Sequence, residues 1–158
     1  MPVLFNQNSS SGGGSSAQYL YVGGYLNNQT VTGLTLVNPN STSINTGFNV
    51  SSLGITIINA GRYELTFRAK FSLSELIAKL GIIVYKNGIP IASADAFINN
   101  SSGANVLQTI NTNAVFNANA NDLIELKANA TDALGANINV TILGDGMHEQ
   151  ALLVIKSI

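Results

Sequence analysis

The sequence predicts an all-β domain, an antiparallel jelly-roll sandwich of roughly eight to ten short strands. Apolar and polar side chains alternate with a period of two in many segments, and turn residues separate those segments. The clearest strand runs from Tyr63 to Phe71, where every second side chain is apolar and those between are polar or charged. The pair Asn87-Gly88, between two apolar segments, predicts a hairpin because it accepts the positive φ angles of a type I′ turn.

The other strands are predicted wherever the same alternation recurs. They cover residues 19–22, 31–37, 55–58, 82–86, 89–94, 106–116, 123–128, 138–143 and 151–155. A turn at residues 144–146 precedes the last of them. Ser72 to Leu80 suggests a helical turn, with a strand or a loop as equal alternatives.

Composition excludes several functional classes. The 158 residues suffice for one domain with a sizeable core, and only 9% of them are charged, against about 25% in ordinary domains. The charges of the seven basic and eight acidic residues nearly cancel, and the basic residues are scattered along the chain. No nucleic-acid partner is therefore expected. No apolar run of about 18 residues and no secretory signal are present, so neither a membrane partner nor a signal peptide is expected. A neutral polar surface of this kind suits subunits that pack densely.

No set of residues indicates catalysis, a metal or a cofactor. Cysteine is absent, and the one histidine, His148, lies between Asp145 and Glu149 without a second histidine or a nucleophile motif. We interpret this cluster as a polar loop before the last strand rather than as an acid/base or metal site. Asp122, Asp132 and Asp145 are isolated acids, and none lies in a calcium-loop pattern. We therefore expect no enzyme activity, no catalytic residues and no bound metal.

The first 61 residues carry no charged side chain, and within them a flexible segment gives way to the folded domain. Residues 1–17 are predicted to be an N-terminal connector and residues 18–158 the jelly-roll domain. The connector has an apolar tag and a flexible spacer, although an engineered linker would have the same composition as the spacer. The tag is Val3, Leu4 and Phe5, and the spacer includes Ser9, Ser10, Ser11, Gly12, Gly13, Gly14, Ser15 and Ser16.

The alternating apolar side chains of two predicted strands are candidates for the core or for a subunit interface, and the aromatic ones could also line a ligand pocket. These residues are Tyr63, Leu65, Phe67, Phe71, Leu153 and Ile155.

Four segments resemble the jelly-roll superfamily of tumour necrosis factor and the complement heads. Residues 57–67 resemble its Gly-X-Tyr strand, and residues 83–91 resemble its Asn-Gly hairpin. Residues 120–126 resemble a later strand, with Asn121 where glycine is usual, and residues 151–156 resemble the terminal strand. The similarity is closest to the C-terminal domain of BclA-like glycoproteins of the spore exosporium, although this chain lacks their collagen-like stalk. In place of that stalk this chain has the tag and spacer, which are similar to those of spore appendage fibre subunits.

The resemblance implies a homotrimer at the spore surface, built into a fibre. Trimers would stack head to tail, with each connector docking into the next trimer, and an anchoring spore-coat protein and a BclA-like tip protein would be further partners. The alternative implied by the same resemblance is a trimeric head that binds a protein or a glycan.

Overall fold

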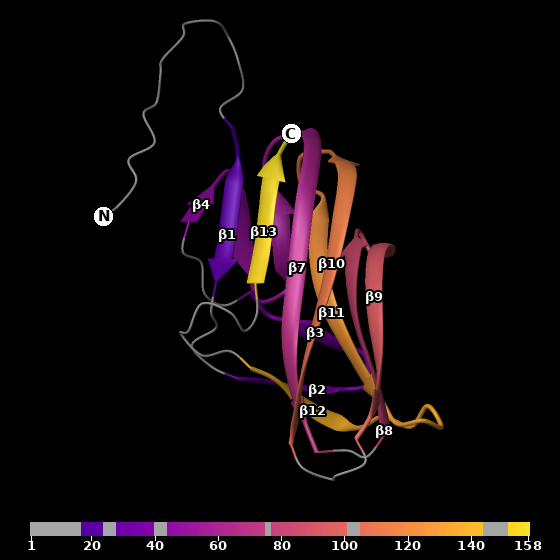
Figure 1. Ribbon diagram of the computed structural model, residues 1–158. Coiled ribbons are helices and arrows are strands. Elements are labelled where there is room, and N and C mark those ends of the chain that lie inside the picture. The colour runs from indigo at the N-terminus through magenta and orange to yellow at the C-terminus, as the bar shows by residue number, and fades with distance from the viewer. Residues whose placement is uncertain (1–16, 24–27, 40–43, 75–76, 101–104, 144–151) are drawn as a thin grey trace, which may run out of the picture.

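Thirteen strands and no helix make up the part of the chain that the structure, a computed structural model, describes (Figure 1). The described residues are 17–23, 28–39, 44–74, 77–100, 105–143 and 152–158. The strands are β1 (Tyr19–Gly23), β2 (Gln29–Thr32), β3 (Thr35–Val37), β4 (Ile44–Thr46), β5 (Phe48–Ser51), β6 (Gly54–Ile57), β7 (Gly61–Leu73), β8 (Ile77–Lys86), β9 (Ile89–Asn99), β10 (Val106–Ala118), β11 (Leu123–Thr131), β12 (Asn139–Ile142) and β13 (Leu152–Ser157). Among these residues, none forms a helix that could cross a membrane.

The two sheets are antiparallel and pack face to face. The first has seven strands in the order β2-β12-β7-β13-β1-β4, with β10 paired along the other side of β7. The second has six strands in the order β5-β6-β11-β8-β9, with β3 paired to β11. Strand β7 is the centre of the first sheet, because β10 pairs with all 13 of its residues while β13 and β12 share its opposite side. The predicted antiparallel jelly roll is therefore confirmed.

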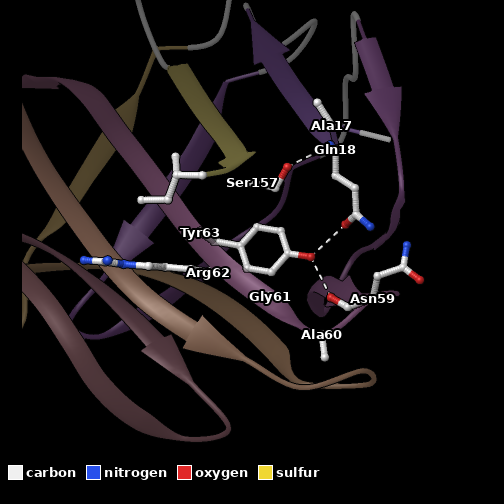
Figure 2. Close-up of a pocket in the computed structure, with 9 residues that line it drawn as sticks. Ala17, Gln18, Asn59, Ala60, Gly61, Arg62, Tyr63 and Ser157 are labelled. Carbon is white, nitrogen blue, oxygen red and sulfur yellow. Dashed lines mark hydrogen bonds between the residues drawn. The ribbon is translucent and has the colours of Figure 1, made fainter. Parts of the chain in front are cut away.

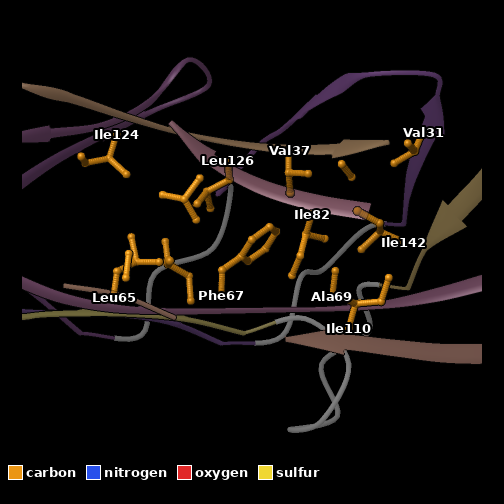
Figure 3. Close-up of a cluster of buried hydrophobic side chains, with 14 of the residues drawn as sticks. Val31, Val37, Leu65, Phe67, Ala69, Ile82, Ile110, Ile124, Leu126 and Ile142 are labelled. Atoms are coloured by element: carbon orange, nitrogen blue, oxygen red, sulfur yellow. The ribbon is translucent and has the colours of Figure 1, made fainter. Parts of the chain in front are cut away.

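The core fills the space between the sheets with the inward side chains of β7, β8 and β11 (Figure 3). Alternate residues of β7 are buried from Tyr63 to Leu73, which is the period-two pattern predicted for this strand. Phe67 of β7 faces Leu126 of β11 across the sandwich in Figure 3. Facing layers of branched and aromatic side chains give such a core its packing density.

The predicted strand over residues 31–37 is two strands instead. A turn at Gly33 and Leu34 separates β2 from β3 and sends them to different sheets. Gly33 has φ +57°, and the side chain of Asn137 lies 2.6 Å from where its Cβ would be, so any larger residue would have a strained backbone and would displace Asn137. The hydroxyl of Thr35 accepts the backbone N–H of Thr32 at 3.0 Å and closes the turn.

Three further predictions need correction. Strands β4 and β5 were not predicted, because Ile44–Thr46 and Phe48–Ser51 are too short to show a clear period. They raise the number of described strands to thirteen, above the expected eight to ten. Of the alternatives for residues 72–80, the helical turn is absent from the described part of that segment and the strand alternative holds, since β7 ends at Leu73 and β8 begins at Ile77.

Candidate assembly surfaces

The first and last described residues lie together at one end of the sandwich, the termini end, where they line a hollow (Figure 2). The hollow has a volume of about 280 Å³ between the start of β1, the turn before β7 and the end of β13. The backbone N–H of Gln18 donates to Oγ of Ser157 at 2.9 Å, and the N–H of Ser157 donates to the carbonyl oxygen of Gln18 at 3.0 Å. The chain before Ala17 is therefore attached to the folded body at this end.

The hydroxyl of Tyr63 is the polar centre of this hollow. It lies 2.6 Å from the carbonyl oxygen of Asn59 and 2.7 Å from the side-chain amide of Gln18, which is itself buried. The hydroxyl is the donor to both acceptors, so its one proton is shared between the carbonyl oxygen of Asn59 and Oε1 of Gln18. Burial raises the pKa of the Tyr63 phenol above its usual value of 10.0. The group therefore stays neutral and acts as a structural link between β1 and β7.

The outward face of the first sheet combines uncharged polar side chains on β10 with charged side chains on β7. Along β10 the outward side chains are mainly asparagine and threonine, whereas those of β7 are mostly charged: Arg62, Glu64, Arg68 and Lys70, with Thr66 and Ser72. Oγ1 of Thr66 donates to Oδ1 of Asn113 at 2.8 Å across the two strands. Two large apolar side chains of β10, Leu107 and Val115, are each 55% exposed among these polar groups. The β10 side of this face can be covered by another subunit at little desolvation cost, whereas the cations of β7 would need a compensating charge.

Further apolar side chains lie along the lateral edge of the sandwich, where β9 ends the second sheet and β10 ends the first (Figure 1). Phe97 of β9 is 65% exposed and Ile89 at the start of the same strand is 68% exposed. These two side chains lie at opposite ends of the same edge strand, so a partner would have to cover the length of the edge to bury both. The edge and the face are different surfaces, so a contact between the edge of one copy and the face of the next is heterologous, and it closes into a ring when the rotation between copies is a closed one.

The end of the sandwich opposite the termini, the distal end, presents Leu134 and Leu34 on two neighbouring turns. Leu134 is 94% exposed on the turn between β11 and β12, and Leu34 is 54% exposed on the turn between β2 and β3. Oδ1 of Asp132 accepts the backbone N–H of Leu134 at 2.9 Å and that of Ala136 at 2.8 Å. These bonds hold the turn in one shape, so Leu134 is displayed on a fixed support rather than on a free loop.

The structure places all six predicted core or interface residues in the core of the chain itself. Tyr63, Leu65, Phe67, Phe71, Leu153 and Ile155 are at most 1% exposed. Sequence reasoning did not identify Leu34 and Leu134 as surface candidates, because a residue on a turn has no period that reports its exposure. It also did not identify Leu107, an apolar residue on the outward side of β10.

Several predicted features lie outside the described residues. They are the tag, the spacer up to Ser16, the turn at residues 144–146, and His148 with Asp145 and Glu149. Of the isolated acids, Asp122 and Asp132 are described, and both accept hydrogen bonds from backbone N–H groups in loops. Within the described chain, no three His, Cys, Asp or Glu side chains come together as metal ligands would.

Comparison with known proteins identifies the fold. No family model and no curated protein sequence matches the chain. Among solved structures, murine APRIL at pH 5.0 superimposes with a TM-score of 0.63 and 13% identity, covering 90% of this chain and all of that one. Eiger TNF from S. frugiperda gives a TM-score of 0.62 and 10% identity, covering 90% of this chain and 91% of that one. The fold is a TNF-like jelly roll.

This TNF-like jelly roll explains one departure noted in the sequence. Asn121, which the sequence comparison placed where the resembled motif has glycine, has a φ angle of +70°. Asparagine is one of the few residues other than glycine that adopts this left-handed conformation readily. The substitution therefore preserves the backbone turn that leads into β11.

Proposed function

We propose that the chain is a structural subunit of a bacterial spore-surface fibre, in which trimers of TNF-like jelly rolls stack head to tail through their N-terminal connectors. The observation that supports stacking most directly is the polarity of the domain. The connector is attached at the termini end, whereas the rigidly held Leu134 and its neighbour Leu34 are exposed at the distal end. A tag on one end and an apolar surface on the other make a contact that repeats without closing.

Trimer formation is supported by the two lateral surfaces. The edge of β9 and β10, where Phe97 and Ile89 are exposed, differs from the outward face of β7 and β13. The same pair of surfaces can therefore be used by every copy around a threefold axis. A head domain with the TNF-like fold is suited to this arrangement, because its long central strands present one continuous face.

The connector is long enough for the task. Residues 6–17 span about 40 Å when fully extended and have a root-mean-square reach of roughly 19 Å as a random coil. Strand β7, which runs the height of the sandwich, has 13 residues and is about 43 Å long. The tag only has to cross the gap between two stacked trimers, not the height of a whole trimer. A connector of this length therefore reaches the facing distal end of the next trimer.

The energetics favour three tags acting together. Burying Val3, Leu4 and Phe5 gives on the order of 4–6 kcal/mol of transfer free energy before the cost of ordering the tag. One tag alone would bind weakly. Three tags on one trimer bind with a high effective concentration, so the joint between trimers is durable and still flexible.

The spore-surface location is supported by the resemblance to spore appendage subunits. Labelling spores of the source organism with an antibody against the domain tests this part separately. Label along surface filaments supports the location, and label confined to the cytoplasm of vegetative cells contradicts it.

Deleting residues 1–16 tests the stacking mechanism. We expect the full-length chain to form fibres under the electron microscope and the truncated chain to remain as single trimers, with the mass measured by light scattering. A full-length variant with Val3, Leu4 and Phe5 replaced by serine should behave like the truncated chain. A variant with Ser9, Ser10 and Ser11 replaced by glycine should still form fibres, because it keeps the tag and the spacer length. Fibres formed without the tag contradict the proposal.

A trimeric head that binds a protein or a glycan is the second candidate, supported by the TNF-like fold itself. The same truncation distinguishes the two functions. A binding head keeps its ligand after the connector is removed, whereas a fibre subunit loses its assembly.

A further inference from the structure

Arg68 lies near the middle of β7 with its side chain on the outward face of the first sheet. It is paired in register with Asn111 of β10 on one side and with Leu152 of β13 on the other. The side chain is half-buried, and its Nε atom is shielded from solvent with no hydrogen-bond partner. Buried polar atoms in proteins are nearly always satisfied, so an orphaned guanidinium nitrogen indicates a missing acceptor.

Lys70 lies two residues farther along the same face and is also half-buried. Neither Arg68 nor Lys70 has an acidic partner within 4.0 Å among the described residues, where the ion pairs join Lys86 to Asp122, Lys127 to Glu125 and Lys156 to Glu64. Those pairs occupy three of the described acids. The other two are Asp132, which holds its own turn, and Asp95, which belongs to β9 of the second sheet.

The outward face of the first sheet is therefore positive although the whole chain has a net charge of −1. Its described charged residues are Arg62, Glu64, Arg68, Lys70 and Lys156, four cations and one anion, which sum to +3. Covering two unpaired cations with another subunit would remove water from both without replacing its hydrogen bonds, which is strongly unfavourable. A negatively charged oxygen group placed there would satisfy both.

We propose that Arg68, with Lys70 beside it, binds an oxyanion where the trimer covers this face of β7. The inference rests on the proposed trimer, because only a covered face needs the compensating charge. The guanidinium fork of arginine matches the two oxygens of a carboxylate, phosphate or sulfate group, and the lysine ammonium adds a point charge. Two sources share this chemistry, a free inorganic anion and a carboxylate of the chain itself.

The test uses the full-length chain with Val3, Leu4 and Phe5 replaced by serine, so that trimers stay separate. Thermal unfolding is measured with and without inorganic phosphate at constant ionic strength, with chloride as the balancing anion. For a free anion, phosphate should raise the midpoint of the parent by about 3 °C or more. Arg68→Gln should abolish that rise. Lys79→Gln should keep it, because Lys79 is an exposed lysine on β8 of the other sheet.

The second arm identifies a carboxylate of the chain. If phosphate has no effect, Arg68→Gln is combined in turn with Glu75→Gln, Asp95→Asn, Asp145→Asn and Glu149→Gln. If the shift in the unfolding midpoint of one double variant differs from the sum of the shifts of its two single variants, that acid supplies the oxyanion.

Two results overturn the site. One is an equal phosphate response in the parent and in Arg68→Gln, which would be a general salt effect. The other is a parent with neither a phosphate response nor coupling to any of the four acids. Light scattering keeps this failure distinct from failure of the proposed function, because a trimer without the response contradicts the anion site alone, whereas a monomer contradicts the trimer.

Discussion

The side chain of Asn87 is hydrogen-bonded to that of Asp122, and this contact joins the tip of the β8–β9 hairpin to the loop before β11. Nδ2 of Asn87 donates to Oδ1 of Asp122 at 2.8 Å, and Oδ1 of Asn87 accepts the backbone N–H of Leu123 at 2.8 Å. The backbone N–H of Asn87 also donates to the carbonyl oxygen of Leu123 at 2.9 Å. The asparagine that makes the hairpin turn with φ +50° therefore also fixes the position of the turn on the domain.

Asp122 makes the stability of the domain depend on pH. The hydrogen bond from Asn87, the backbone N–H of Asn119 and the nearby Lys86 lower the pKa of the Asp122 carboxyl below its usual value. A pKa that is lower in the folded state contributes stability above the unfolded pKa, about 3.9, and this contribution is lost as the pH falls through the folded pKa. We expect Asp122→Asn to be less stable than the parent at pH 7, with the difference shrinking below about pH 4.

Urea unfolding of the parent and of Asp122→Asn at pH 7, 5 and 3 measures this difference. A difference in the free energy of unfolding that stays constant over these pH values contradicts the assigned role of the carboxylate.

Gly54 and Gly88 should respond differently to alanine, although both have positive φ angles. Gly54 has φ +142°, and a Cβ there would lie 2.3 Å from the carbonyl oxygen of Ile124. Gly88 has φ +79° and open space around the same position. Gly54→Ala should therefore lower the free energy of unfolding by more than about 2 kcal/mol, through backbone strain and the clash. Gly88→Ala should lower it by about 1 kcal/mol, through the left-handed backbone alone. Chemical unfolding of both variants is the measurement, and equal losses would show that the clash relaxes.

Tyr63→Phe should destabilise the domain by about 1–2 kcal/mol, because it leaves the Asn59 carbonyl and the Gln18 amide without the hydroxyl that links them. The loss from Gln18→Leu should be smaller in the Tyr63→Phe background than in the parent, which a double-mutant cycle measures. Tyr85→Phe is the matched control. The Tyr85 ring lies 4.3 Å from Nζ of Lys127 and no hydrogen bond involves its hydroxyl in the described structure, so this change should cost less than about 0.5 kcal/mol.

Leu134→Ser should abolish fibres while leaving trimers intact. Leu134 contributes nothing to the core, being 94% exposed, so its loss should change the unfolding midpoint little and affect only the contact between trimers. Leu53→Ser is the control, since Leu53 is a 65% exposed leucine on the turn between β5 and β6. Electron microscopy with light scattering separates the two effects. Fibres of unchanged length in Leu134→Ser would show that the connector docks elsewhere.

Local pattern alone was enough to predict the class of fold and its central elements. The period-two alternation from Tyr63 to Phe71 identified the core strand, because successive side chains of a strand point to opposite faces whatever the strand pairs with. Asn87-Gly88 identified the hairpin because its turn depends on the φ preferences of two adjacent residues.

Only the tertiary structure decided which strands pair and which surface residues act together. The register of β7 with β10, the division of residues 31–37 between two sheets and the contact of Gln18 with Tyr63 each join segments through contacts that no local period encodes. The same holds for Arg68, which in the sequence is one of several polar residues on an alternating strand. Its missing partner became visible only when β10 and β13 were placed on either side of it, because burial and electrostatic balance depend on neighbours in space.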